Sequence, residues 1–271
     1  MHAERSQEAA SCSGLVKIYW TASGEVHALK GIDAVFPSRS VTAVVGPSGS
    51  GKSSLLRILA GLDVATAGAV RIGGTSVAGA KARALRGVRR RFTGYVFQRP
   101  SDNLVPYLTV EGHMRQAARL RRTKLDSNEL LEKLGLQGRA EHKPDQLSGG
   151  EQQRLAFAQA VVGNPYMVVA DEPTSELDSR SATALLDTVS SLTDLGVSFV
   201  ISTHDPEVVK MADRTLHLRH GALEAESHQM RTLSVIDHSG RIQLPPGALE
   251  LFPDRRGVIQ VDSEGVWITP P

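Results

Sequence analysis

The sequence VTAVVGPSGSGKSSLLRILAGL, residues 41–62, decides how this chain folds. Val41–Val45 is a short β-branched run that predicts a buried strand, and the LLRIL segment after Ser54 predicts a helix. The stretch between them, Gly46–Ser53, fits the pattern G-x-x-x-x-G-K-[ST] over its full length. A strand, a glycine-rich loop and a helix in this order favour an α/β fold that holds a ligand at the loop.

The glycine-rich loop predicts a binding site for the phosphates of a nucleotide. Backbone N–H groups of such a loop can wrap a phosphate chain, and the helix that follows directs its positive end toward it. Lys52 can reach the β- and γ-phosphates, and the Ser53 hydroxyl can ligate Mg²⁺. The alternative is a flexible connection without a ligand, which the flanking strand and helix disfavour. The residues predicted to bind here are Gly46, Pro47, Ser48, Gly49, Ser50, Gly51, Lys52, Ser53 and Ser54.

Two acidic residues follow a second predicted strand, Tyr166–Ala170. Open α/β sheets bind their ligands at the carboxyl ends of the strands, where Asp171 and Glu172 would lie. We expect Asp171 to hold Mg²⁺ and Glu172 to act as general base on an attacking water. Alone, such a pair would be read as two solvated acids, but the phosphate loop favours the catalytic interpretation.

Two further polar residues end predicted strands. Gln98 follows Gly94–Phe97 and can contact both Mg²⁺ and water, with a plain polar turn residue as an equal alternative. His204 follows Val197–Ser202 and can hydrogen-bond the γ-phosphate and hold Glu172, although a lone histidine is more often structural.

The order of the remaining segments predicts a sheet with crossover helices. Arg180–Leu195 has helical spacing and lies between two predicted strands, which favours a mixed or mostly parallel sheet. Thr109–Leu136 reads as helices without a strand, so we expect a helical subdomain over about residues 99–147. Its arginines form either a basic binding face or a solvated one. After Gly221 the chain turns polar, and we expect a linker at Glu224–Gln229 before a small all-β module at residues 233–271.

Composition narrows the class of protein. The 271 residues are 41% hydrophobic with a formal net charge of +2, too balanced to suggest nucleic acid as the partner. The single cysteine, Cys12, excludes a disulfide framework and is expected on a flexible tail at residues 1–13. No apolar run is long enough to span a bilayer, and the first residues do not resemble a signal peptide. We expect a cytoplasmic protein that reaches a membrane only through a partner.

These motifs, together with LSGGEQQR at 147–154, resemble those of the ATP-binding cassette (ABC) ATPases over roughly residues 14–225. The resemblance implies a P-loop cassette that hydrolyses ATP with Mg²⁺ and works as a head-to-tail homodimer. It implies that Ser148, Gly149 and Gly150 close over the γ-phosphate held by the other copy, and that SELD at 175–178 crosses between the two sites. It also implies that Tyr19 stacks on adenine, a role for which Trp20 competes. The family more often has alanine where this chain has Glu176.

GEVHALKGID, NLVPYLTV and the EQQR ending resemble the cassettes of lipoprotein release, macrolide export and cell-division signalling. This likeness implies a peripheral protein on the cytoplasmic face of the inner membrane. Its partner would be an integral membrane permease with few transmembrane helices, and the ATPase would power export, extraction or transmembrane signalling. Two alternatives remain, a soluble non-transport ABC ATPase and an ATP-linked DNA-binding regulator.

IDHSGRIQLPPGAL at 236–249, with GVIQV and GVWIT after it, resembles the AbrB-type swapped-hairpin domain. Such domains form intertwined dimers, and many bind DNA through clustered basic residues. We expect dimerisation here and no DNA binding, because acidic residues outnumber the basic ones. The alternative is a β-rich tail that packs on the ATPase domain. The basic residues are Arg241, Arg255 and Arg256, and the acidic ones are Asp237, Glu250, Asp254, Asp262 and Glu264.

Overall fold

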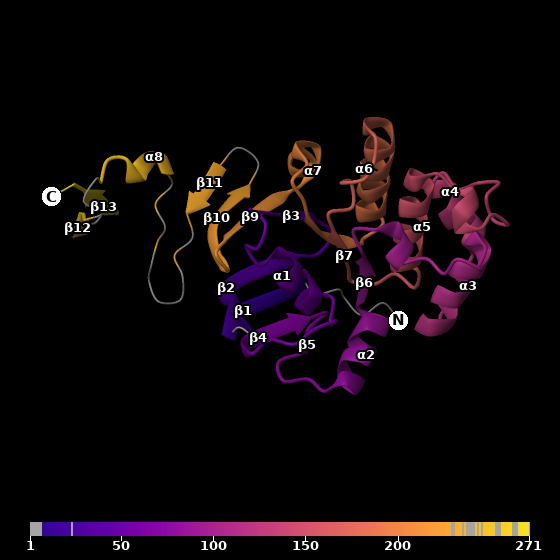
Figure 1. Ribbon diagram of the computed structural model, residues 1–271, viewed down its shortest axis with the longest axis horizontal. Helices are drawn as coiled ribbons and strands as arrows, with labels where there is room; N and C mark the ends of the chain where they lie inside the picture. Colours follow the sequence, from indigo (N-terminus) through magenta and orange to yellow (C-terminus); the bar gives the residue numbers. More distant parts are fainter. Residues whose placement is uncertain are drawn as a thin grey trace.

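The computed structural model describes residues 7–22, 24–228, 231–234, 236, 242, 244, 246–252, 256–261 and 265–270. Within these residues a seven-stranded mixed sheet runs through the molecule in the order β11-β10-β9-β3-β8-β7-β6 (Figure 1). Strands β9, β3, β8, β7 and β6 are parallel, β10 runs antiparallel to β9, and β11 runs antiparallel to β10. The bounds are β3 Val41–Val45, β6 Thr93–Val96, β7 Met167–Asp171, β8 Ser198–Ser202, β9 Arg214–Arg219, β10 Ala222–His228 and β11 Arg231–Ser234.

The central strands are apolar because both faces of this sheet are covered. In β7, Val168 and Ala170 pack into one core with the helical part of the chain, whereas Met167 and Val169 face the other core. The expected α/β class and the strands predicted at 41–45, 94–97, 166–170 and 197–202 are thereby confirmed, with ends shifted by a residue at most.

A second, antiparallel sheet with the order β2-β1-β4-β5 was not predicted from the sequence. Helix α1 (Lys52–Leu59) lies between the two sheets, and its four buried apolar residues Leu55, Leu56, Ile58 and Leu59 fill the core they share. This packing fixes the phosphate loop, which is joined to the first residue of α1. The bounds are β1 Glu8–Thr21, β2 Gly24–Pro37, β4 Ala67–Ile72 and β5 Thr75–Ser76.

Helices form the far end of the molecule, on the side of β6 (Figure 1). The predicted helical segment contains α3 (Val110–Arg121) and α4 (Ser127–Lys133), flanked by the short helices η1 (Pro100–Asp102) and η2 (Pro144–Gln146). No helix in the described part of the chain is both long and apolar enough to cross a membrane. The remaining helices are α2 (Ala82–Arg91), α5 (Gly149–Val161), α6 (Ser179–Asp194), α7 (Pro206–Met211) and α8 (Pro246–Leu249).

The flexible tail expected at residues 1–13 is wrong for the residues that the structure describes there. Strand β1 begins at Glu8, and Ala9, Ala10 and Cys12 are buried in the core shared by the two sheets. Small side chains suit this strand because it pairs with β2 on one side and β4 on the other. Burial raises the pKa of the Cys12 thiol to about 12, so this cysteine is an inert core residue.

The linker expected at Glu224–Gln229 is also wrong over Glu224–His228, which belong to β10. Two of the charged side chains that suggested a linker form ion pairs with arginines of the neighbouring strand. Glu226 pairs with the buried Arg214, and Glu224 lies 3.6 Å from Arg219. Glutamates that would disfavour a buried strand are thus accommodated by arginines of β9.

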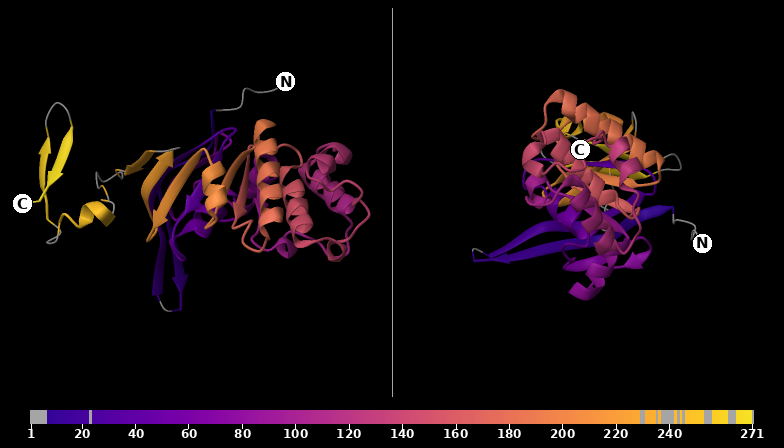
Figure 2. Two further views of the ribbon diagram at one scale, coloured as in Figure 1. Left: turned by 90° about the horizontal axis from the view of Figure 1, so that it is seen from above. Right: turned by 90° about the vertical axis from the view of Figure 1, so that its right-hand side faces the viewer.

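Beyond β11 the described residues form α8 and a two-stranded sheet of β12 (Val258–Val261) and β13 (Val266–Thr269). Figure 2 shows these elements set apart from the two main sheets. The apolar strands expected at 257–261 and 265–269 are confirmed. Residues 237–241, which carry the Asp-x-x-Gly-Arg motif, lie outside the described residues, as do Asp254, Arg255, Asp262 and Glu264.

Candidate active site

A cavity of about 920 Å³ lies at the edge of the larger sheet where β3, β7 and β8 end. It gathers residues that are far apart in the sequence, since Tyr19, Gln98, Asp171 and His204 all line it together with residues 48–54. Every predicted site residue lines this cavity except Gly46, Pro47 and the three residues of the LSGG stretch. A cavity of this size at strand ends fits a nucleotide.

The phosphate loop needs its glycines for steric reasons. A Cβ on Gly46, whose φ is 151°, would lie 2.0 Å from the Leu218 carbonyl oxygen. A Cβ on Gly51, whose φ is 106°, would lie 2.5 Å from the carbonyl oxygen of Ala28. The loop therefore runs directly against the backbones of β9 and β2, and other residues would displace it.

The polar groups of the loop are arranged for an anion. Lys52 Nζ donates to the carbonyl oxygens of Gly46 at 2.6 Å and Pro47 at 3.3 Å, so the ammonium group lies over the loop. No side chain of the described residues caps the start of α1. The buried Ser50 hydroxyl has no hydrogen-bond partner among the described residues. A phosphate chain would supply the negative charge and the acceptors that these groups lack.

One serine at the end of β8 contacts both predicted acidic residues, Asp171 through its carboxylate and Glu172 through its backbone N–H. The Ser202 hydroxyl donates to Asp171 Oδ1 at 2.5 Å, and the Glu172 N–H donates to Ser202 Oγ at 3.0 Å. Glu172 has a φ of 46°, an uncommon conformation for a residue other than glycine. Its Oε1 lies 3.1 Å from His204 Nε2, which is 3.4 Å from Lys52 Nζ. His204 Nε2 thus contacts both Glu172, the predicted base, and Lys52 of the phosphate loop.

Sequence reasoning missed Ser202. It assigned Ser175 only to the segment that crosses between two sites, and did not predict that the Ser175 hydroxyl lies 3.4 Å from Gln98 Nε2. A polar residue at the end of an otherwise apolar strand is the one signal that could have identified Ser202. Residues Val26–Ala28 also line the cavity and were not predicted to do so. The sequence carries no signal for them, because they belong to β2, which reaches the cavity from the second sheet.

The two aromatic candidates for adenine stacking differ in position. Tyr19 lines the cavity, and its hydroxyl donates to Asp63 Oδ2 at 3.0 Å. Lys17 Nζ lies 4.7 Å from the centre of the tyrosine ring and forms an ion pair with Asp63. Trp20 is 69% exposed and does not line the cavity. The geometry therefore favours Tyr19 over Trp20 as the aromatic wall.

Three predicted oxygen donors for a metal line the same cavity, namely the Ser53 hydroxyl, the Gln98 amide and the Asp171 carboxylate. The described residues contain no cluster of three or more His, Cys, Asp or Glu side chains that could cage a metal. This donor set fits Mg²⁺, which prefers oxygen ligands and is usually held by one or two carboxylates together with phosphates and water.

The LSGG stretch lies outside the cavity of its own chain. Ser148 caps α5, and a reciprocal pair of hydrogen bonds joins it to Glu151. A hydrogen bond from Arg139, with one from the Ser148 N–H, lowers the pKa of Glu151 to about 2. A Cβ on Gly150 would lie 2.7 Å from Ser181 Oγ, so close packing on α6 requires this glycine. A Cβ on Gly149 would meet nothing within 4 Å among the described residues, so steric crowding by them does not require a glycine here.

The chain was compared with protein-family models, curated proteins and solved structures, and all three gave matches. The family model described as "ABC transporter" matches residues 29–175. The chain is 38% identical over 228 residues to the lipoprotein-releasing system ATP-binding protein LolD of Pseudoalteromonas translucida, covering 96% of that protein and 81% of this chain. It is 41% identical over 204 residues to the macrolide export ATP-binding/permease protein MacB of Shigella flexneri, covering 73% of this chain but only 31% of MacB. Among solved structures, a dimeric post-hydrolysis state of the ATP-binding cassette MJ0796 bound to ADP and Pi superposes with a TM-score of 0.74. It is 32% identical, and the match covers 82% of this chain and 99% of that one.

Proposed function

The chain belongs to the ABC transporter family, and on this premise we propose that it hydrolyses ATP as the nucleotide-binding subunit of a membrane transporter. One observation carries the proposal: a single cavity gathers the phosphate loop, Asp171 and the Glu172–His204 pair. The ADP and Pi named for the MJ0796 structure indicate which ligand such a cavity takes.

The proposed reaction follows from the positions of the polar groups. The loop N–H groups and Lys52 bind the β- and γ-phosphates, and Tyr19 forms a wall for the adenine. Ser53, Gln98 and Asp171 would hold Mg²⁺, which neutralises the charge that develops on the phosphates. Glu172 accepts a proton from water as the water oxygen attacks the γ-phosphorus, and ADP leaves. His204 holds the Glu172 carboxylate in place through the 3.1 Å contact.

The site is proposed to be complete only in a head-to-tail homodimer. A Cβ on Gly149 would meet none of the described residues within 4 Å, which leaves room for a close approach by another molecule. The start of α5 would direct its N–H groups at the γ-phosphate bound by the partner copy. Ser148 and Gly150 would take part in the same contact, and residues 175–178 would cross between the two sites. ATP binding then joins the copies and hydrolysis releases them.

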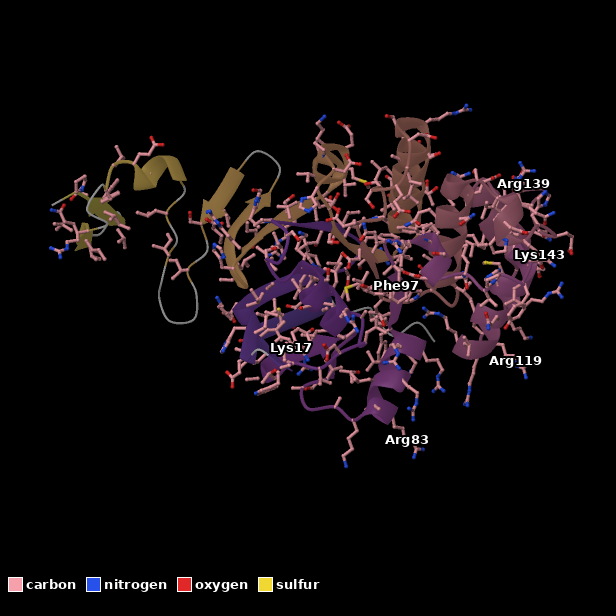
Figure 3. All side chains as sticks on the ribbon, viewed as in Figure 1. Lys17, Arg83, Phe97, Arg119, Arg139 and Lys143 are labelled. Atoms are coloured by element: carbon pink, nitrogen blue, oxygen red, sulfur yellow. The ribbon has the colours of Figure 1, made fainter. Side chains whose placement is uncertain are left out.

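The surface proposed for the permease is an arginine-rich groove of about 840 Å³ between α2 and α3. Of the described residues that line it, none is acidic. Figure 3 shows Arg83 on α2 and Arg119 on α3 at the edge of the molecule where basic side chains project. We therefore propose that an acidic cytoplasmic segment of the permease docks here and holds the ATPase at the inner membrane. The arginines that line the groove are Arg83, Arg86, Arg89, Arg90, Arg121 and Arg122.

The partner can be identified by capture from native membranes with a tagged Glu172→Gln chain and ATP, followed by mass spectrometry. We expect one integral membrane protein with few transmembrane helices. Changing both Arg86 and Arg90 to Glu should lower its recovery by about tenfold or more, because exposed charges in the groove would repel an acidic segment. The matched control reverses Lys30 and Arg71, two exposed charges on the other sheet. Capture of ribosomes or nucleic acid instead would support the soluble ABC ATPase.

The C-terminal sheet is proposed to dimerise with the same element of a second copy, as in the AbrB-type domains. Directly paired residues share a face, so Ile259, Val261, Val266 and Ile268 form one aliphatic face. The first three of these residues are 64–75% exposed, which leaves the face uncovered by the described residues. An isolated two-stranded hairpin is marginally stable in water, so this face needs a partner. A second copy would hold two ATPases near each other and raise their effective concentration.

Val261→Glu should convert an ATP-free dimer into monomers in analytical ultracentrifugation, weakening association by roughly a hundredfold, because a charge would be buried in the aliphatic interface. Gln260→Glu, on the opposite face of the same strand, should leave the dimer intact. A monomeric wild-type chain would contradict the dimer. Salt-resistant DNA binding in a gel shift would favour the regulator.

A further inference from the structure

A small polar pocket of about 170 Å³ adjoins the proposed ATP site. Three separate segments line it: residues 98–101 after β6, the first turns of α5, and residues 173–177 after the catalytic acid. Gln98 lines both this pocket and the ATP cavity. The pocket therefore lies between the proposed metal-binding glutamine and the helix that begins with the LSGG stretch.

Gln153 is the unusual residue of this pocket. Its side chain is 1% exposed, and neither its Oε1 nor its Nε2 has a hydrogen-bond partner among the described residues. A buried amide without partners destabilises a fold, and native proteins rarely keep one without a reason. An apolar side chain of the same length would fill this position without that cost, so the amide requires an explanation.

We propose that Gln153 binds ordered water in this pocket, and that it is thereby a positioning residue linking α5 to Gln98. The volume has room for several water molecules, since one occupies about 30 Å³ in the liquid. A buried water needs two to four polar partners. The Gln98 amide and the Glu176 carboxylate line the same pocket and can complete the shell of a water bound to Gln153.

Direct contacts beside the pocket show which segments the water would join. Gln98 Nε2 donates to Ser175 Oγ at 3.4 Å, and Arg99 lies 3.9 Å from Glu176. These two contacts already tie residues 98–99 to the loop after Glu172. Gln153 adds the third segment, because it lies one turn after Gly149 on α5. Water at Gln153 would thus connect Gln98, a proposed metal ligand of the ATP site in the same chain, to the start of α5, which is proposed to contact the ATP bound by the partner copy.

The inference rests on the proposed ATPase function, and Gln153→Met tests it. Methionine has a similar length and no amide, so we expect an unchanged or higher Tm. The KM for ATP should stay within about twofold while kcat falls about tenfold, the size of effect seen when a residue between two sites is changed. The control is Thr188→Val on α6, which also removes a buried polar group but lines neither this pocket, the ATP cavity nor the arginine-rich groove. It should leave kcat unchanged.

A crystal structure of the full chain provides the direct test. Ordered waters within hydrogen-bonding distance of the Gln153 amide, absent in Gln153→Met, would support the proposal. A dry pocket would overturn it, and so would a Met variant with wild-type kcat or one whose activity falls only in step with its Tm. If the wild-type chain hydrolyses no ATP, the proposed function fails, whereas the waters remain observable.

Discussion

Glu172→Gln is expected to abolish turnover and leave ATP binding intact. The general base contributes about 10²–10⁴-fold to a hydrolysis of this kind, so phosphate release should fall by about a thousandfold. The phosphate loop and Lys52 are unchanged, so the variant should still bind ATP. It should then accumulate with its two ATPase domains closed on ATP. Size-exclusion chromatography with light scattering would detect this as an ATP-dependent dimer in a chain that also carries Val261→Glu, because that change removes the ATP-independent dimer.

Glutamine suits this experiment because it preserves the local structure. The backbone of Glu172 is held by its N–H donations to Ser202, which the substitution does not touch. The amide oxygen can still face His204 Nε2 when that nitrogen carries a proton. A loss of activity would therefore report on the base and leave the fold unaffected. His204→Ala is the companion variant, with a smaller loss expected because histidine only positions the carboxylate. Normal hydrolysis by Glu172→Gln would mean that another group is the base.

The strands that the sequence predicted correctly are those buried on both faces. VTAVV and YMVVA are continuous apolar runs, and each ends in a residue that lines or adjoins the site. Strands β1 and β2 were missed because their alternation is interrupted. The pairing register of β1 with β2 shifts between Cys12 and Leu15 and again between Lys17 and Ile18. Each shift changes which residues of the strand face the core. The alternation of buried and exposed residues that marks a strand is therefore not visible in the sequence.

In the candidate site, too, local sequence features could be predicted and contacts between distant segments could not. Motif spacing identified Lys52 because it ends the glycine-rich loop, and Asp171 and Glu172 because they lie at the end of a recognisable strand. It could not identify Ser202 as the residue that joins the two acids, since that contact spans about thirty residues and depends on the neighbouring strand β8. The polar pocket at Gln153 is hidden for the same reason: helical spacing marks Gln153 as polar, but burial by η1 and the loop at 173–177 is a tertiary effect.

Gly149→Asp is expected to abolish ATP hydrolysis without affecting the monomer. A side chain at Gly149 meets nothing within 4 Å, and an acid in the first turn of α5 is favourable to the helix dipole. The free energy of unfolding should therefore change by less than about 0.5 kcal/mol. In a head-to-tail dimer, however, the carboxylate would face the partner's γ-phosphate, and losing that stabilisation should lower kcat by about a hundredfold or more.

Mixing variants shows whether this effect acts across the dimer. Lys52→Ala should be inactive because its own phosphate loop loses a cation that binds the γ-phosphate. In a heterodimer of Lys52→Ala with Gly149→Asp, one composite site carries both changes and the other carries neither, because each site takes its loop from one copy and its α5 from the other. Random mixing should thus restore about a quarter of wild-type activity if one intact site suffices, since about half of the dimers are mixed. If Gly149 served its own chain, each copy would be inactive alone and together, and the mixture would remain at the level of the single variants.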